Sequence, residues 1–315
     1  MEILRYDDSL KSKWDEAVQK SKNGVFLFYR DYLDYHKDRF NDHSLVILKA
    51  GKICALFPAN EKDKEIVSHG GLTFGSLIMS YDVKAVEVLE IFESVIQYYR
   101  DKDINKITYK AVPSIFHKYP SEEDLYALFR FNAKLVRRDL SSVVKLDNKI
   151  KFSESKKQAV TKCEKLGIEV VENNDLERYW SLLTEVLAKF DTKPVHSLKE
   201  ITRLQNDFPE NIRLFEAKKG EDLLAGILIY DYQNVVHTQY MANSQEGRKI
   251  GALDFINHKL MQEVFSNREY YSFGISTENQ GLDLNAGLIQ QKEMMGSRGI
   301  AIDFYAISLS NNIKI

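Results

Sequence analysis

The sequence predicts an α/β protein, of the α+β kind, with two similar halves in which a mixed, mostly antiparallel sheet is flanked by helices. The chain has 315 residues, which suits two domains of about 100–200 residues each. Strand and helix patterns alternate along both halves. The second half also contains three consecutive strand patterns with short turns, which indicates an antiparallel meander. We place the boundary near residue 150, so the domains span 1–150 and 151–315.

Periodicity and turn residues give the elements of the first half. Gly51 separates two apolar runs of strand length, which predicts a β-hairpin. Apolar residues recur every three or four positions between 83 and 101, which predicts an amphipathic helix. The expected order is helix 9–22, helix 29–40, strands 44–50, 52–58 and 65–69, helix 83–101, strand 106–112, a helix from Ser121, and one or two strands across 133–146.

The second half repeats this plan. Its middle meander strand contains LLAGILIY, which is apolar enough to be buried on both faces. The expected order is helices 153–166, 176–189 and 197–205 around a strand at 168–172, strands 211–217, 223–232 and 235–243, a helix from about Gly247, strand 270–274, helix 284–295 and strand 300–308. The shared order of elements indicates one supersecondary plan used twice.

Charge is distributed unevenly along the chain. The net charge is -2, yet residues 130–165, the basic segment, contain eleven basic and four acidic residues, a local charge of +7. Such a segment can attract a phosphate-bearing ligand or a nucleic acid. A solvated linker surface explains the same charges equally well, so both interpretations stay open.

Composition and simple motifs exclude several classes. Cys54 and Cys163 are far apart in the sequence and suit two structural thiols in a reducing cytoplasm. No apolar run approaches the roughly 18–20 residues of a membrane helix, and the acidic N-terminus is no secretory signal. We therefore expect a cytoplasmic protein. GxGxxG, GxxxxGK[ST] and GxSxG are absent, and without an i, i+4 histidine pair or a cysteine cluster we expect no metal.

One junction favours phosphate binding. Strand 235–243 runs into SQEGRKIGALDF (244–255), which opens a helix. A helix N-terminus offers unpaired N–H groups and the positive end of the helix dipole, which suit a pyrophosphate. Arg248 and Lys249 add charge, and Gly247 and Gly251 allow close approach of the backbone. Gly251 can equally serve tight packing of the helix on the sheet.

The order of elements across 167–309 resembles the GNAT acyltransferase fold. That family binds the coenzyme A pyrophosphate at a Q/R-x-x-G-x-G/A turn, and this sequence has Arg248 to Leu253, with Leu253 in place of the last small residue. The resemblance implies acetyl-CoA or another acyl-CoA as the donor. It assigns donor binding to nine residues: Tyr240, Met241, Ala242, Gly247, Arg248, Lys249, Ile250, Gly251 and Ala252.

The stretch 270–296 resembles the closing motif of FemAB-related proteins, which are tandem GNAT-like proteins. The matching residues are Tyr270, Gly274, Gly287, Leu288, Lys292 and Gly296. Ordinary GNAT enzymes usually carry a tyrosine where this sequence has Lys292. More specifically, the stretches 35–44, 68–76, 193–197 and 237–242 resemble FemAB-like GNAT proteins found among bacterial surface-polysaccharide genes, a group of putative acetyltransferases. The resemblance implies two tandem GNAT-like domains, with a degenerate N-terminal one.

Three residues are candidates for catalysis. His237 lies in a strand whose counterpart in the GNAT plan splays from its neighbour, and its ordinary pKa near neutrality suits a general base. Glu278 follows a strand end and is either a base for an acceptor ammonium or a turn cap. Lys292 is either a cation that stabilises an oxyanion or phosphate, or a solvent-facing lysine. Backbone N–H groups of 240–242 are expected to stabilise the tetrahedral oxyanion.

Five residues are candidates for binding the acceptor. His69 lies between Ser68 and two glycines, in a ligand-lined turn or one that glycine merely shapes. His36 is a ligand or a core residue, and His196 lines the acceptor site or caps a helix. Gln239 shares a strand face with His237. We expect His36, His69 and His196 to lie around an acceptor between the two domains.

The leading interpretation is an N-acyltransferase that moves an acetyl or other acyl group from acyl-CoA to an amino group on a sugar or nucleotide sugar. The enzyme would act mostly by positioning the two reactants. A FemAB-type ligase that uses aminoacyl-tRNA is an alternative from the same fold, supported by the basic segment. A non-catalytic module that binds carbohydrate or nucleotide on a degenerate GNAT scaffold is the alternative from another class.

Overall fold

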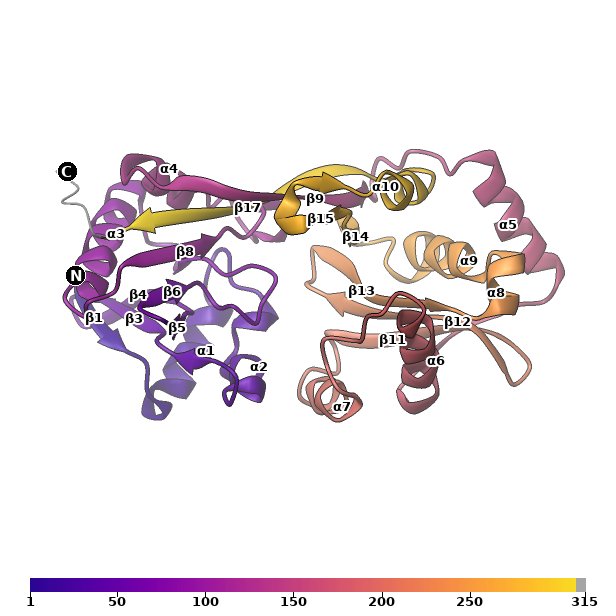
Figure 1. The fold of residues 1–315 in the computed structure, drawn as a ribbon, viewed down its shortest axis with the longest axis horizontal. Helices are drawn as coiled ribbons and strands as arrows, with labels where there is room; N and C mark the ends of the chain where they lie inside the picture. Colours follow the sequence, from indigo (N-terminus) through magenta and orange to yellow (C-terminus); the bar gives the residue numbers. More distant parts are fainter. Residues whose placement is uncertain (310–315) are drawn as a thin grey trace. The chain divides into compact units, whose positions relative to one another are not determined.

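The computed structural model describes residues 1–309, and contacts divide the chain into two compact units (Figure 1). Within the described residues, unit 1 contains Met1–Asp139, Asn279–Leu282 and residues 301–309. Unit 2 contains Leu140–Glu278 and Asp283–Ile300. These bounds differ from a single division at residue 150. The reason is that β17 (Arg298–Ser308) pairs with β8 (Lys106–Lys110), so the chain returns to unit 1.

Unit 1 contains two sheets. One has the order β1-β3-β4-β7, and in the other β2, β5, β6 and β8 are followed by β17 and β9. β6 and β8 are parallel and α3 connects them along the chain. The elements are β1 (Glu2–Arg5), α1 (Lys11–Gln19), α2 (Arg30–Leu33), β2 (Asn41–Asp42), β3 (Leu45–Lys49), β4 (Lys52–Phe57), β5 (Asn60–Lys62), β6 (Glu65–Val67), β7 (Ile78–Met79), α3 (Ala85–Arg100), α4 (Glu123–Arg130) and β9 (Lys134–Lys145).

The helix expected over 29–40 is shorter in the structure. α2 ends at Leu33 and a 3₁₀ turn follows over Asp34–His36. The N–H groups of Lys37 and Arg39 donate to the carbonyls three residues before them, so the tighter 3₁₀ geometry replaces the α-helix.

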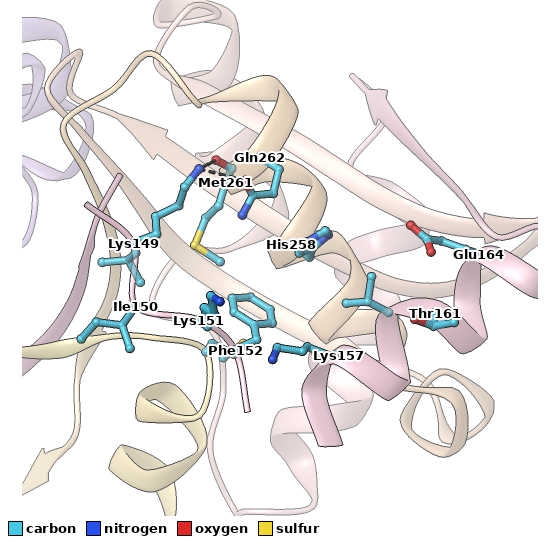
Figure 2. A pocket seen from close by; sticks show the side chains of 13 residues that line it. Lys149, Ile150, Lys151, Phe152, Lys157, Thr161, Glu164, His258, Met261 and Gln262 are labelled. Atoms are coloured by element: carbon cyan, nitrogen blue, oxygen red, sulfur yellow. Dashed lines mark hydrogen bonds between the residues drawn. The ribbon is translucent and has the colours of Figure 1, made fainter. Parts of the chain in front are cut away.

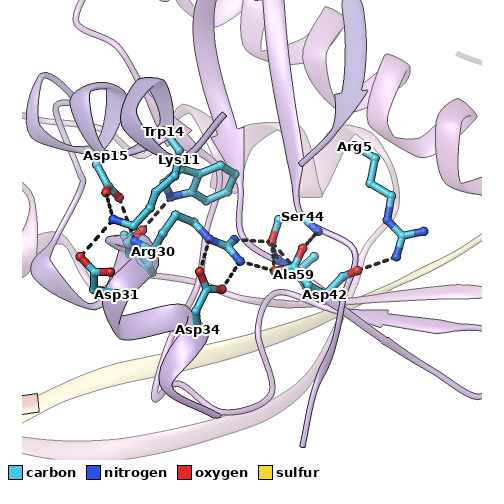
Figure 3. Close-up of polar contacts among 11 residues, drawn as sticks. Arg5, Lys11, Trp14, Asp15, Arg30, Asp31, Asp34, Asp42, Ser44 and Ala59 are labelled. Carbon is cyan, nitrogen blue, oxygen red and sulfur yellow. Dashed lines mark hydrogen bonds and ion pairs between the residues drawn. The ribbon is translucent and has the colours of Figure 1, made fainter. Parts of the chain in front are cut away.

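Arg30 anchors this segment in unit 1 (Figure 3). Only 2% of Arg30 is exposed, and its guanidinium carbon lies 3.7 Å from the centre of the Tyr6 ring. It forms ion pairs with Asp34 and, at 2.8 Å, with Asp42. A buried cation needs such partners, because removing either carboxylate would leave part of its charge uncompensated. The cluster therefore fixes α2 against the start of the β3 hairpin.

Unit 2 contains strands in the order β10-β11-β12-β13-β14-β9, and β15 pairs with β16 in a small separate sheet. The antiparallel meander is confirmed, and β12 is buried from Leu224 to Asp231, as its apolar run predicted. The elements are α5 (Glu154–Lys165), β10 (Glu169–Asn173), α6 (Glu177–Ala188), α7 (Leu198–Asp207), β11 (Ile212–Lys219), β12 (Asp222–Asp231), β13 (Val235–Asn243), α8 (Gln245–Ile250), α9 (Ala252–Lys259), β14 (Tyr270–Ile275), β15 (Thr277–Glu278), β16 (Asp283–Leu284) and α10 (Ala286–Glu293).

Candidate functional site

Two parallel strands of unit 2 part from each other after a short pairing. β14 pairs with β13 only from Val235 to His237, whereas β12 pairs with β13 along nearly its whole length. The β12–β13 register shifts after Leu228, which leaves Gln239 as an extra, bulged residue. A bulge bends its strand and increases the local twist. The bend therefore opens a fork after His237, where β13 lacks a strand neighbour on the β14 side among residues 1–309.

A buried lysine and a histidine lie at the fork. Lys292, on α10, is 4% exposed, and its ammonium donates to the carbonyls of Gly274 (3.0 Å) and Ile275 (2.6 Å) at the end of β14. Burial lowers the pKa of Lys292 to about 8. His237 Nδ1 lies 3.0 Å from Ser272 Oγ, and burial, with the Lys292 charge, lowers the pKa of His237 to about 4. The fork thus combines a neutral imidazole with an amine that titrates near neutrality.

A tyrosine pair supports the bulged part of β13. The hydroxyl of Tyr179, on α6, donates to the Tyr240 carbonyl at 2.9 Å, and the Tyr240 hydroxyl lies 2.7 Å from His196 Nδ1. Tyr179 reaches β13 because it packs on Gly226, where a Cβ would lie 2.4 Å from its ring. We missed Tyr179 in the sequence. The available signal was a glycine inside an apolar strand, which often marks a close approach by another group.

Glu278 lies in β15, and its side chain contacts the residue that caps the helix carrying Lys292. Its carboxylate accepts a hydrogen bond from Asn285 Nδ2 at 2.7 Å, and Asn285 Oδ1 caps α10 by accepting from the Leu288 N–H. Glu278 is exposed. The Glu278 side chain is therefore linked to the N-terminal cap of α10.

The expected phosphate turn consists of α8 and the start of α9. Ser244 caps α8 by accepting from the Gly247 N–H at 3.0 Å. A Cβ at Gly247 would lie 2.1 Å from the Leu224 carbonyl oxygen, and one at Gly251, with φ of +82°, would lie 2.5 Å from Ala159 Cβ on α5. Both glycines therefore satisfy packing needs. Arg248 and Lys249 are exposed. The other predicted donor residues flank this turn: Tyr240, Met241 and Ala242 in β13, Ile250 in α8 and Ala252 in α9.

Unit 1 contains its own buried polar cluster. His36 and His69 are each 2% exposed, with ring centres 5.2 Å apart. His69 has φ of +57°, which is uncommon for a residue other than glycine and marks local strain. Burial holds its pKa well below the usual range. Ser68 Oγ accepts from the Lys110 N–H at 2.7 Å, so Ser68 and His69 belong to one cluster.

Lys110, on β8, completes that cluster. It is 5% exposed, and its ammonium donates to the carbonyls of His69 (3.0 Å) and Leu72. Burial, with the Arg137 charge, lowers its pKa to about 7. We did not single out Lys110 in the sequence, although a lysine at the end of the strand KITYK offered a weak signal.

Two further observations concern ions and membranes. Within residues 1–309, no group of three or more histidine, cysteine, aspartate or glutamate side chains is arranged to hold a metal ion. In the same part of the chain, every helix is too short or too polar to cross a membrane.

Comparison with known proteins identifies solved structures with a similar fold. No family model and no curated protein matches the sequence. Among solved structures, FemX is similar over 98% of this chain and 97% of its own, with a TM-score of 0.69 and 11% identity. L-PGS from Bacillus licheniformis has a TM-score of 0.62 and 13% identity, over 96% of this chain and 93% of its own. These similarities confirm the predicted FemAB-like GNAT fold.

A third similar structure is a single domain of a larger protein. The C-terminal domain of a putative lysylphosphatidylglycerol synthetase from Agrobacterium fabrum has a TM-score of 0.61 and 11% identity, over 94% of this chain and 92% of its own. At such low identity the likeness concerns the fold alone.

Proposed function

We propose that this chain transfers an acyl group to an amino group at the fork in unit 2. The observation that carries the proposal is Lys292, a buried amine that donates to two carbonyls, beside a strand edge that the Gln239 bulge opens. Successive N–H groups of a strand point to opposite edges, so the ones among Tyr240 to Ala242 that face away from β12 would stabilise the oxyanion that forms when the amine attacks an acyl carbonyl.

The two titratable groups have complementary roles in this proposal. The Lys292 pKa of about 8 lies close to the ordinary value of about 8.5 for a thiol. Its ammonium therefore suits protonation of a departing thiolate, or stabilisation of the oxyanion. His237 is neutral at pH 7, so its unprotonated ring nitrogen can take the proton that the acceptor ammonium must lose, directly or through water, before the neutral amine attacks. Glu278 remains a proposed alternative base.

For the donor, we favour acyl-CoA. Arg248 and Lys249 are exposed on α8 and available to a pyrophosphate, and no metal is needed for amine attack on a thioester. Gly247, Ile250, Gly251 and Ala252 would hold the backbone of the turn against the sheet and α5. The acyl arm would run along the free edge of β13, at Met241 and its neighbours.

For the acceptor, we favour an amino sugar or a nucleotide sugar. In unit 2, His196 and Gln239, near the fork, are the proposed acceptor-binding residues. In unit 1, His36, Ser68 and His69 form a separate cluster that we propose as a binding site for sugar hydroxyl groups. Neutral imidazoles and hydroxyls suit sugar hydroxyl groups, because each can both donate and accept hydrogen bonds. Burial keeps His69 neutral at pH 7, consistent with this role.

Aminoacyl transfer from tRNA is the second candidate. It is favoured by the full-length similarity to FemX and by the +7 charge of the basic segment. The name of the Agrobacterium fabrum protein contains a product, lysylphosphatidylglycerol, in which a lysyl group has been transferred. In this version the leaving group would be a ribose hydroxyl instead of a thiolate.

Thermal-shift measurements distinguish transfer from acyl-CoA and transfer from aminoacyl-tRNA. The full chain is measured with acetyl-CoA, a long-chain acyl-CoA and total tRNA. We expect stabilisation by at least one acyl-CoA, and its loss in the Arg248→Glu variant with the fold intact. Stabilisation by tRNA alone, with an affinity that falls steeply as salt rises, would establish the second candidate. If no acyl-CoA has an effect, the leading proposal is wrong.

A further inference from the structure

A separate cavity of about 410 Å³ lies in unit 2, between α5, α9 and the segment 149–152 (Figure 2). Its apolar lining comes from Val144, Ile150, Phe152, Val160, Met261 and Met295. The volume falls within the roughly 300–1,000 Å³ that is typical of small-molecule sites. None of the fork residues lines it, so this cavity has no part in the proposed transfer.

Three lysines of the basic segment line the cavity, and Glu164 is its one acidic lining residue. Lys149 is held by the Gln262 side chain at 2.9 Å, and Lys157 by Glu154 at 2.6 Å. The Lys151 ammonium has no hydrogen-bond or ion-pair partner among residues 1–309 and is exposed. Three lysines thus outweigh Glu164 and Glu154, and the lining keeps a net positive charge, which favours an anionic ligand.

The cavity also offers a surface for a flat ring. Phe152 is partly exposed and packs edge-on against His258, with ring centres 5.6 Å apart. His258 Nδ1 is buried and has no hydrogen-bond partner within the described chain. An unsatisfied buried polar atom is costly, and a ligand that hydrogen bonds it would remove that cost. The Met261 thioether completes a surface that suits a planar, polarisable group.

We propose that this cavity binds a nucleoside phosphate. Its phosphate would lie against Lys151 and Lys157, and its base against Phe152, with an edge atom bonded to His258 Nδ1. A simple inorganic anion would leave the apolar lining unused, and an alkyl phosphate would leave His258 unsatisfied. The site joins α5 to α9, which are already tied by the Lys156–Asp254 ion pair (2.7 Å), so the ligand would stabilise these two helices against each other.

The test uses calorimetry and thermal shift on the full chain at low salt. The probes are the four common nucleoside 5′-monophosphates and diphosphates, the corresponding nucleosides, inorganic phosphate and octyl phosphate. We expect saturable binding of at least one nucleotide, at least tenfold tighter than its nucleoside and than inorganic phosphate. Binding of octyl phosphate as tight as that of every nucleotide would overturn the assignment, as would the absence of nucleotide binding.

Variants locate the binding. Lys151→Glu should weaken nucleotide binding by about tenfold or more, the scale of one lost charge-assisted contact. Phe152→Leu keeps the apolar packing and should weaken nucleotide binding severalfold while leaving phosphate binding unchanged. Lys165→Glu changes the same charge on an exposed residue of α5 outside the cavity and serves as the control. Equal losses in Lys151→Glu and Lys165→Glu would reduce the effect to general electrostatics and overturn the proposal.

Discussion

The two units contain similar pairs of parallel strands but differ in what lies beyond the paired residues. Each has two parallel strands linked through a helical segment, β6 and β8 in unit 1 and β13 and β14 in unit 2, and each has a buried lysine bound to main-chain carbonyls. In unit 1 the loop after β6 fills the space beyond the paired strands. The Ser68 N–H donates to the Thr108 carbonyl at 2.9 Å, and the Gly75 N–H to the Lys110 carbonyl at 2.8 Å. In unit 2 the bulge at Gln239 leaves the fork open.

The difference indicates where chemistry can occur. A strand edge whose N–H groups are already bonded has none left for an oxyanion, whereas an unpaired edge keeps them available. We therefore propose that unit 1 is the degenerate copy and that its cluster serves binding, while unit 2 performs the transfer. Variants in each of the two units test this difference.

The largest expected effect is on catalysis through Lys292. Lys292→Met should lower kcat by about 10²–10³-fold, the scale for removing one group that stabilises developing charge. Release of coenzyme A in the presence of a panel of amino sugars measures this. Lys110→Met, the matched change in unit 1, should leave kcat within about threefold. Similar losses of kcat in both variants would contradict the proposal that unit 2 performs the transfer and unit 1 does not.

In unit 1, the loop after β6 fills the space beyond the paired strands. We therefore expect a change in this loop to have a large effect on the stability of unit 1. A Cβ at Gly75 would lie 2.2 Å from the Ser68 carbonyl oxygen, so Gly75→Ala must displace the loop. We expect unit 1 to lose about 2 kcal/mol of unfolding free energy, within the range for overpacking. Urea unfolding can follow the units separately, because Trp14 lies in unit 1 and Trp180 in unit 2.

The control for this experiment is a pair of single-tryptophan backgrounds, Trp180→Phe and Trp14→Phe. Only the background that retains Trp14 should report the change. If Gly75→Ala leaves the Trp14 transition where it was, the loop does not hold the unit 1 strands together as described.

The open fork predicts a pH dependence of catalysis. If the Lys292 ammonium is the required form, kcat should fall about tenfold per pH unit above its pKa of about 8. The acceptor should be an amine of low pKa, so that it does not titrate in this range. Lys292→Arg keeps a charge that does not titrate, and its profile should be flat there. A wild-type profile that stays flat to pH 10 would remove Lys292 from the chemistry.

A further pH dependence is expected in the stability of unit 1. Burial lowers the Lys110 pKa from 10.5 to about 7, so between these values the unfolded chain binds more protons than the folded one. Stability should therefore rise as pH rises from about 7 toward 10.5, by at most about 1.4 kcal/mol per pH unit from this residue. Lys110→Met should reduce the slope for the Trp14 transition. An unchanged slope would mean that Lys110 is charged in the folded protein.

Sequence patterns predicted the helices and strands in which buried side chains recur at a regular spacing. The β12 run and the meander were foreseeable because neighbouring strands with short turns pair with each other. Lys292 could be found only through the family resemblance, since its burial depends on where α10 packs. The bulge at Gln239 is a property of register between two strands, and no residue type signals it. Lys110 and Tyr179 were missed because contacts from distant segments bury them.

The pairing of β17 with β8 affects the order of events during synthesis. Phe304 lies opposite Lys110, so β8 cannot gain this neighbour until the intervening residues of unit 2 have been translated. At about 5–20 residues per second, the delay is roughly 10–40 seconds. During that interval, one edge of β8 lacks its partner strand on the nascent chain, and such an edge is open to chaperones and to aggregation.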